Sequence, residues 1–239
     1  MRLRTAVVIP ALDAEATIAP IVSRARSDGH VVVVVDDGSR DHTAERARAA
    51  GAIVLVHALN RGKGAAIRTA LFWAREHGLD AIVTLDADGQ HPASQIDRLL
   101  DASSAPDAIV VGLRDLVAAG APRPNQLRNA FARGFLSLVT ATRLGDTQCG
   151  MRRYPVSATL DLGVIDDRFG FETEVVLRAI AARLPIVQVP IDVAYPLDRT
   201  THFDSRRDPW RIVGRVLRTL LIERPGLTRF PRDARRRLL

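Results

Sequence analysis

The segment Ala81–Pro92, AIVTLDADGQHP, carries the most informative pattern in the sequence. Its largely apolar start is typical of a strand buried on both faces of a parallel sheet. Asp86 and Asp88 follow, and because a chain leaving a strand is still extended, residues two apart are expected to face the same way. Two carboxylates so close repel each other, and a divalent cation such as Mg²⁺ or Mn²⁺ relieves that repulsion. Gln90 offers the same ion a neutral oxygen.

An alternative interpretation treats these residues as turn formers and helix caps before a helix that begins near Ala93. For an isolated Asp-x-Asp this alternative is the stronger one. The position directly after an apolar strand favours a metal site formed by Asp86, Asp88 and Gln90.

The same order, an apolar run followed by polar residues, recurs along the first half of the chain. Helix-like stretches separate these runs, and alternating strands and helices are typical of βαβ units on a parallel sheet. Ligands bind beyond the carboxyl ends of such strands. The expected strands are Val7–Pro10, Val31–Val35, Ile53–Val56, Ala81–Leu85 and Ala108–Val111, and the expected helices are Ala14–Arg26, His42–Ala50 and Gly64–His77.

The second half is less regular. It predicts a long helix over Asn125–Arg143, a turn around Gly150, a helix over Glu172–Arg183 and a late strand over Ile186–Val193. No linker or repeat interrupts it. We therefore expect one catalytic domain over residues 1–198, followed by a basic segment over residues 199–239.

Asp36 and Asp37 end the second expected strand, and Gly38 allows the backbone to turn sharply there. A carboxylate at this point can accept the ring N–H of uracil or guanine. The alternative is a plain turn with Asp41 as a helix cap, which explains Asp41 but leaves the Asp36 and Asp37 pair unexplained.

Lys63 is the only lysine among 34 basic residues and has a glycine on either side. A compact ammonium group where arginine fills every other basic position suggests a point charge near a phosphate. The spacing is not that of a P-loop. An exposed loop lysine explains the residue equally well.

The net charge of +7 lies in the tail, since residues 199–239 hold 12 arginines and four acids, against 22 basic and 23 acidic residues before them. Residues 207–239 carry an amphipathic helical pattern that fits a helix packed on the body, the commoner case, or one in peripheral contact with a lipid surface. Arg235, Arg236 and Arg237 add a basic end that suits lipid contact, and the sequence leaves both alternatives open. Only 5% of residues are aromatic, which argues against nucleic-acid binding. No run is long and apolar enough to span a bilayer, and no signal-peptide layout is present. Together with a single cysteine, these features predict a cytoplasmic protein, with the inner face of the membrane as its place of contact.

Five motifs in order resemble those of the family 2 glycosyltransferases of the GT-A fold. They are Val8–Asp13, Val35–Ser39, Asn60–Gly64, Asp86–Pro92 and Asp146–Arg152. The similarity covers roughly residues 5–200 and is greatest to the polyprenyl-phosphate and dolichol-phosphate subgroup. It implies an α/β GT-A fold, Rossmann-like with a mostly parallel central sheet flanked by helices, and here with a basic C-terminal helical tail.

The resemblance also implies roles for individual residues. The subgroup often has Asn-Glu after its first strand, where this chain has Asp13-Ala14-Glu15, so the ribose contact stays open between Asp13 and Glu15. For the nucleotide the matching positions are Pro10, Ala11, Asp13, Glu15, Asp36, Asp37, Lys63, Asp86 and Ala87; for the Mg²⁺ or Mn²⁺ ion Asp86, Asp88, Gln90 and His202; for an acceptor phosphate Arg114, Arg128 and Arg199; and for catalysis Asp88, Asp146 and Lys63.

The expected reaction is transfer, with inversion, of a sugar from a GDP- or UDP-linked donor to polyprenyl or dolichyl phosphate. A lipid phosphate is already ionised near neutral pH and needs positioning by arginine rather than a base. A hydroxyl acceptor instead needs a carboxylate base, for which Asp146 is the first candidate. Glu172 and Glu174 stand behind it, although both also fit as acids at a helix N-terminus.

A nucleotidyltransferase would share a similar sheet and acidic metal site. Its usual glycine-rich basic loop is absent after Val8. The sequence does not choose between GDP and UDP or predict an oligomeric state.

Overall fold

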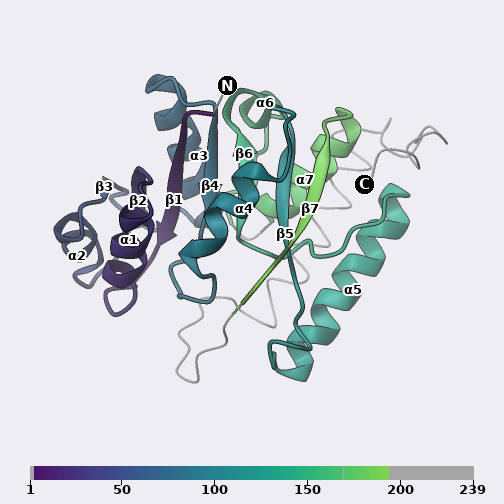
Figure 1. Cartoon of the computed structure of the whole chain (residues 1–239), viewed down its shortest axis with the longest axis horizontal. Coiled ribbons are helices and arrows are strands. Elements are labelled where there is room, and N and C mark those ends of the chain that lie inside the picture. The colour runs from purple at the N-terminus through teal and green to yellow at the C-terminus, as the bar shows by residue number, and fades with distance from the viewer. Residues whose placement is uncertain (1–2, 169, 194–239) are drawn as a thin grey trace.

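The computed structural model of the chain describes residues 3–168 and 170–193. Its centre is a seven-stranded sheet in the order β3-β2-β1-β4-β6-β5-β7 (Figure 1). The strands are β1 (Thr5–Ala11), β2 (Val32–Asp36), β3 (Ile53–Val56), β4 (Ala81–Thr84), β5 (Ile109–Arg114), β6 (Arg152–Pro155) and β7 (Ile186–Ile191).

The predicted parallel sheet is confirmed for β1 to β4 and for the β5–β7 pair. Strand β6 was not predicted, and it runs antiparallel to both β4 and β5. Because Arg152 and Arg153 are charged, this strand lacks the apolar run that is typical of a buried strand. Both arginines are fully buried, and their guanidinium groups donate to main-chain carbonyls, which offsets the cost of removing charge from water.

Helices cover both faces of the sheet because alternate strand residues point to opposite sides. From β1, Val8 joins a core formed with α3 and α7, whereas Val7 and Ile9 join a second core formed with α1 and α4. The helices are α1 (Ile18–Ser27), α2 (Thr43–Ala49), α3 (Lys63–Glu76), α4 (Ile96–Asp101), α5 (Arg123–Thr140), α6 (Val156–Asp161) and α7 (Phe171–Ala181), with a single 3₁₀ turn, η1 (Ala93–Gln95), before α4.

Several predicted boundaries need correction. The long helix covers Arg123–Thr140 rather than Asn125–Arg143. The first helix begins at Ile18 rather than Ala14, because residues 12–17 form a loop that bonds to the β2–α2 connection. The late strand ends at Ile191. The predicted domain boundary at residue 198 lies beyond the described residues, as does the whole basic tail.

Helix α5 differs from the others in what it exposes. It lies along the β5–β7 side of the molecule (Figure 1) and buries Asn129, Leu136 and Thr140. On its opposite face Leu127, Phe131 and Leu138 are 71%, 68% and 82% exposed. Within the described residues, no helix is both long and apolar enough to cross a bilayer.

Candidate active site

Asp86, in the loop after β4, lies in contact with Lys63, the first residue of α3. The Lys63 ammonium lies 2.6 Å from Oδ1 of Asp86. It also lies 2.7 Å from Oε1 of Glu172, in the first turn of α7. The structure thus brings together two residues that the sequence assigned to the site, and adds Glu172 to them.

This cluster is strongly charged despite its burial. Burial by itself lowers the pKa of Lys63, but the two carboxylates outweigh it and the pKa is raised above its ordinary value. Burial likewise acts to raise the pKa of Asp86, and the Lys63 and His91 side chains hold it below its ordinary value. At neutral pH the site therefore contains an ammonium ion beside an ionised carboxylate.

His91 packs behind Asp86 and was not assigned a role from the sequence. Its side chain is 1% exposed, and Nε2 lies 3.8 Å from Oδ2 of Asp86. Burial lowers its pKa to about 4, against the opposing pull of Asp86, so the imidazole is neutral at neutral pH. Its Nδ1 is buried without a hydrogen-bond partner in the structure.

Glycines allow the chain to close around this cluster. A Cβ atom at Gly150 would overlap the Asp86 carboxylate, so any other residue there would displace that carboxylate. Side chains at Gly62 and Gly64 would overlap the main-chain oxygens of Asp167 and Asp166, respectively. The glycines beside Lys63 therefore make room for the loop before α7.

The loop after β4 is not extended as expected. Strand β4 ends at Thr84 and the chain turns at residues 87–88. Asp88 accepts hydrogen bonds from the main-chain N–H of Gln90 at 3.0 Å and from its side-chain amide at 2.6 Å. The chain from Asp86 to Gln90 is therefore turned rather than extended, and the expectation that an extended chain would make Asp86 and Asp88 face the same way was wrong.

The oxygen-rich groups of this loop do not fill the shell of a hard divalent cation by themselves, so water or a bound phosphate would have to supply the remaining oxygens. Among residues 3–168 and 170–193, no three His, Cys, Asp or Glu side chains are arranged to hold a metal ion. Mg²⁺, however, is commonly held by one or two carboxylates plus substrate phosphates and water. Asp86 and Asp88, with the Gln90 amide, supply a donor set of that kind.

Asp37, the predicted nucleotide contact, is buried and bonds to three groups of the protein itself. Its carboxylate accepts hydrogen bonds from the N–H groups of Arg61 and Gly62, at 2.9 and 2.7 Å. Nδ1 of His57 lies 2.7 Å away. Asp36 next to it accepts the N–H of Ser39 at 2.9 Å. These bonds tie the loop before Lys63 to the end of β2.

The two candidates for the ribose contact both bind the loop after β2. Asp13 adopts a positive φ of 48° and accepts the N–H of Arg40 at 2.8 Å. Glu15 accepts the N–H of His42 at 3.1 Å. Neither geometry favours one candidate over the other.

The remaining donor-side candidates follow the same edge. Pro10 and Ala11 pair with Val35 and Asp36 at the end of β1. The main-chain oxygen of Ala87 accepts a hydrogen bond of 2.6 Å from the Thr17 hydroxyl. Asp41 bonds the N–H of Thr43 and that of Glu15, although the helix cap position is His42.

A second buried pair joins the end of β5 to the loop before β6. Nε and Nη2 of Arg114 lie 2.6 and 3.2 Å from the two oxygens of Asp146. Asn129 and the main-chain N–H of Gln148 donate to the same carboxylate. Burial acts to raise the pKa of Asp146, but Arg114 and these donors lower it below its ordinary value. Asp146 is therefore a weak base.

The structure does not describe the side chains of three predicted site residues, Arg128, Arg199 and His202. Arg128 lies on α5, and its side chain is outside what the structure describes. Arg199 and His202 also fall outside the described residues.

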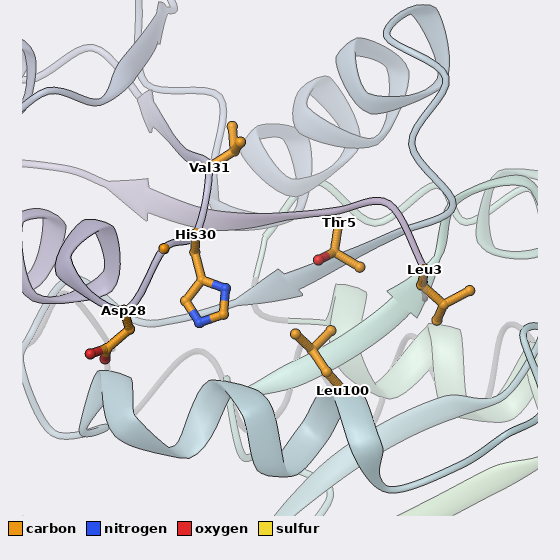
Figure 2. Close-up of a pocket in the computed structure, with 7 residues that line it drawn as sticks. Leu3, Thr5, Asp28, His30, Val31 and Leu100 are labelled. Atoms are coloured by element: carbon orange, nitrogen blue, oxygen red, sulfur yellow. The ribbon is translucent and has the colours of Figure 1, made fainter. Parts of the chain in front are cut away.

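A hollow of about 300 Å³ lies away from these residues. It is lined by Leu3, Thr5, His30 and Leu100, among others (Figure 2). Thr5 is the first residue of β1, so the hollow is at the opposite edge of the sheet from Asp86 and Lys63. It is not part of the candidate site.

Residues 6–158 match the family described as Glycosyl transferase family 2. The chain belongs to this family. Among curated relatives of this family 2 glycosyltransferase, the polyprenol monophosphomannose synthase of Mycolicibacterium smegmatis is 31% identical over 208 residues, covering 79% of this chain and 76% of that protein. The undecaprenyl-phosphate mannosyltransferase of Micrococcus luteus is 31% identical over 171 residues, covering 67% of this chain and 70% of that protein.

Solved structures show the fold of the family 2 glycosyltransferase. Glucosyl-3-phosphoglycerate synthase from Mycobacterium tuberculosis, in complex with Mn²⁺, UDP and glucosyl-3-phosphoglycerate, superposes with a TM-score of 0.69 at 21% identity. The superposition covers 97% of this chain and 82% of that one. The fold is the GT-A fold that the sequence predicts.

Proposed function

We propose that this enzyme transfers a sugar from a nucleoside-diphosphate donor to a polyprenyl phosphate, with a Mg²⁺ or Mn²⁺ ion on the donor diphosphate. The observation that most supports a lipid-phosphate acceptor is the Arg114–Asp146 ion pair. Asp146 was the first candidate for a catalytic base, and in the structure its carboxylate binds the Arg114 guanidinium group. The names of the two curated relatives point to the same acceptor class.

A phosphate acceptor fits this pair better than a hydroxyl acceptor. A hydroxyl must lose its proton, and a carboxylate that holds a guanidinium group and has a lowered pKa is poorly suited to take it. The other candidates are also engaged, Glu172 by Lys63 and Glu174 by Arg178. An ionised phosphate oxygen needs no base, and Arg114, fixed in place by Asp146, is suited to orient it.

The exposed face of α5 supports a lipid-linked acceptor. Leu127, Phe131 and Leu138 present apolar surface to solvent, and the helix carries three arginines and no acid. An apolar stripe with basic residues beside it is typical of a helix at an anionic lipid surface. Asn129 of the same helix binds Asp146, so the stripe and the acceptor pair belong to one element.

On the donor side, we expect the chain's own groups to surround the leaving diphosphate. A bound divalent ion supplies electrostatic stabilisation of the charge that develops as the diphosphate departs. Asp86 and Asp88, with Gln90, would hold that ion, and Lys63 adds a fixed positive charge next to it. Asp37 keeps the loop before Lys63 in place through its bonds to Arg61 and Gly62.

The experiment is a donor panel. Purified full-length protein is incubated with Mg²⁺ and GDP- and UDP-linked sugars, each with and without undecaprenyl phosphate in detergent, and release of the nucleoside diphosphate is measured. We expect one donor to be consumed at least about tenfold faster with the lipid phosphate. Equal stimulation by undecaprenol, which lacks the phosphate, would contradict the proposal and favour a hydroxyl acceptor.

A further inference from the structure

Glu172 shares the Lys63 ammonium with Asp86. The two carboxylates approach it to 2.7 and 2.6 Å, respectively, from α7 and from the loop after β4. All three side chains are largely buried, with Glu172 8% and Lys63 16% exposed. One ammonium ion is thus held between two acids, of which only Asp86 belongs to the metal-binding loop.

The sharing matters because Lys63 and a divalent ion compete for Asp86. Like charges repel strongly at a few ångströms in a buried site. When a cation binds Asp86, the ammonium must either leave or be held by another anion. Glu172 is that second anion, and its position on a different element lets Lys63 stay near the diphosphate while Asp86 turns to the metal.

Glu172 is itself fixed from behind. Nη1 of the fully buried Arg152 donates to the main-chain oxygen of Glu172 at 2.8 Å, and its Nη2 and Nε donate to the oxygens of Thr147 and Cys149. The start of α7 also presses on α3, since a Cβ atom at Gly64 would lie 2.8 Å from Cβ of Phe171. The carboxylate therefore approaches Lys63 from a rigid base.

We propose that Glu172 is a positioning residue that holds Lys63 beside the donor diphosphate while the divalent ion occupies Asp86. The inference rests on the metal-dependent transfer proposed above. Without Glu172, Lys63 pairs with Asp86 alone, which weakens metal binding and moves the ammonium away from the leaving group.

The test is a double-mutant cycle in which the affinity for Mn²⁺ is measured by electron paramagnetic resonance. Mn²⁺ is the only ligand added, without donor or acceptor. We expect Glu172→Gln to bind Mn²⁺ about tenfold more weakly than wild type, a common size for coupled sites. In a Lys63→Gln background the same substitution should change the affinity by less than about threefold, because the competing ammonium is gone.

The matched control is Glu174→Gln, the same change two residues along α7. Glu174 pairs with Arg178 and accepts the N–H of Asp166, so its loss should lower the melting temperature and leave Mn²⁺ affinity within about twofold. In turnover assays Glu172→Gln should lower kcat about tenfold with little change in the donor KM. Glu172→Asp, which keeps the charge, should recover part of the Mn²⁺ affinity.

The outcomes separate this inference from the proposed function. If wild type binds no Mn²⁺, the proposed metal site fails and this inference fails with it. If wild type binds Mn²⁺ and Glu172→Gln binds it equally, only the inference fails. An equal loss in the Lys63→Gln background, or in Glu174→Gln, would show that Glu172 acts through general structure rather than through Lys63.

Discussion

The Lys63 ammonium lies 2.6 Å from the Asp86 carboxylate, across the gap between the start of α3 and the end of β4. This contact joins two motifs that are separate in the sequence into one charged centre. Because both side chains are largely buried, their interaction is screened little by solvent. It places the donor-side residues at the carboxyl edge of the parallel strands, where open α/β sheets bind their ligands.

Gly150→Ala should inactivate the enzyme without unfolding it. The added methyl group would overlap the Asp86 carboxylate, which must then rotate away from Lys63 and from the metal. We expect kcat to fall at least about tenfold, as misplacement of a charged group at a catalytic centre commonly causes, with an unchanged circular dichroism spectrum. Gly134→Ala is the control, because no atom lies within 4 Å of the position that its new Cβ would take; similar losses in both variants would contradict the assignment.

Asp146→Asn should destabilise the protein in a pH-dependent way. The substitution leaves the Arg114 guanidinium group without its carboxylate, at a cost of about 3 kcal/mol near neutral pH. The folded-state pKa of Asp146 lies below its ordinary value of 3.8, so its stabilising contribution is present above that pH and is lost as the pH falls through the folded value.

Urea unfolding of wild type and Asp146→Asn at several pH values checks this. The difference in the free energy of unfolding should be constant from neutral pH down to about 5 and should shrink below about pH 3.8. A difference that stays the same throughout, or one that grows in acid, would mean that the Asp146 carboxylate is not stabilised by Arg114.

Cys149 should be unreactive in the folded enzyme. It is fully buried, and burial raises the pKa of its thiol to about 12, so almost no thiolate exists at pH 8. We expect native protein to resist a disulfide reagent such as DTNB, and guanidinium chloride to release one reactive thiol per chain. Rapid labelling of the native protein would show that the loop carrying Gly150 opens readily.

Phe131→Asp should weaken binding to anionic vesicles. Burying one large apolar side chain at a lipid surface contributes about 1.5–3 kcal/mol, so the partition coefficient should fall by at least about tenfold. Sedimentation of the full-length protein with phosphatidylcholine–phosphatidylglycerol vesicles measures it. Phe72→Asp, a partly exposed phenylalanine on α3, is the control. If both variants bind as wild type does, α5 is not a membrane surface.

The sequence predicted the features of the fold that depend on local pattern. Apolar runs such as Val32–Val35 are readily recognised as buried strands. The acids that follow these runs lie at one edge of the sheet, because parallel strands end at the same edge. Strand β6 could not be found in this way, since Arg152 and Arg153 are buried by hydrogen bonds to carbonyls from distant segments.

The same distinction explains the site residues. Lys63 and Asp86 stood out by composition and position, whereas Glu172 looked like an ordinary acid at a helix start, and its second role depends on how α7 packs on α3. Asp146 was expected as a base candidate, but its partners Arg114 and Asn129 come from β5 and α5. Pairings between such distant elements leave no periodic signal in one sequence.

The most direct test of the central claim is transfer of a radiolabelled sugar from the preferred nucleotide donor to undecaprenyl phosphate, compared between wild type and Asp88→Ala with Mg²⁺ or Mn²⁺. The exposed Asp101→Ala is the control. We predict that wild type and Asp101→Ala form the lipid-linked sugar, that EDTA abolishes its formation, and that Asp88→Ala forms none above background. Full turnover by Asp88→Ala would contradict the assigned metal site and, with it, the proposed mechanism.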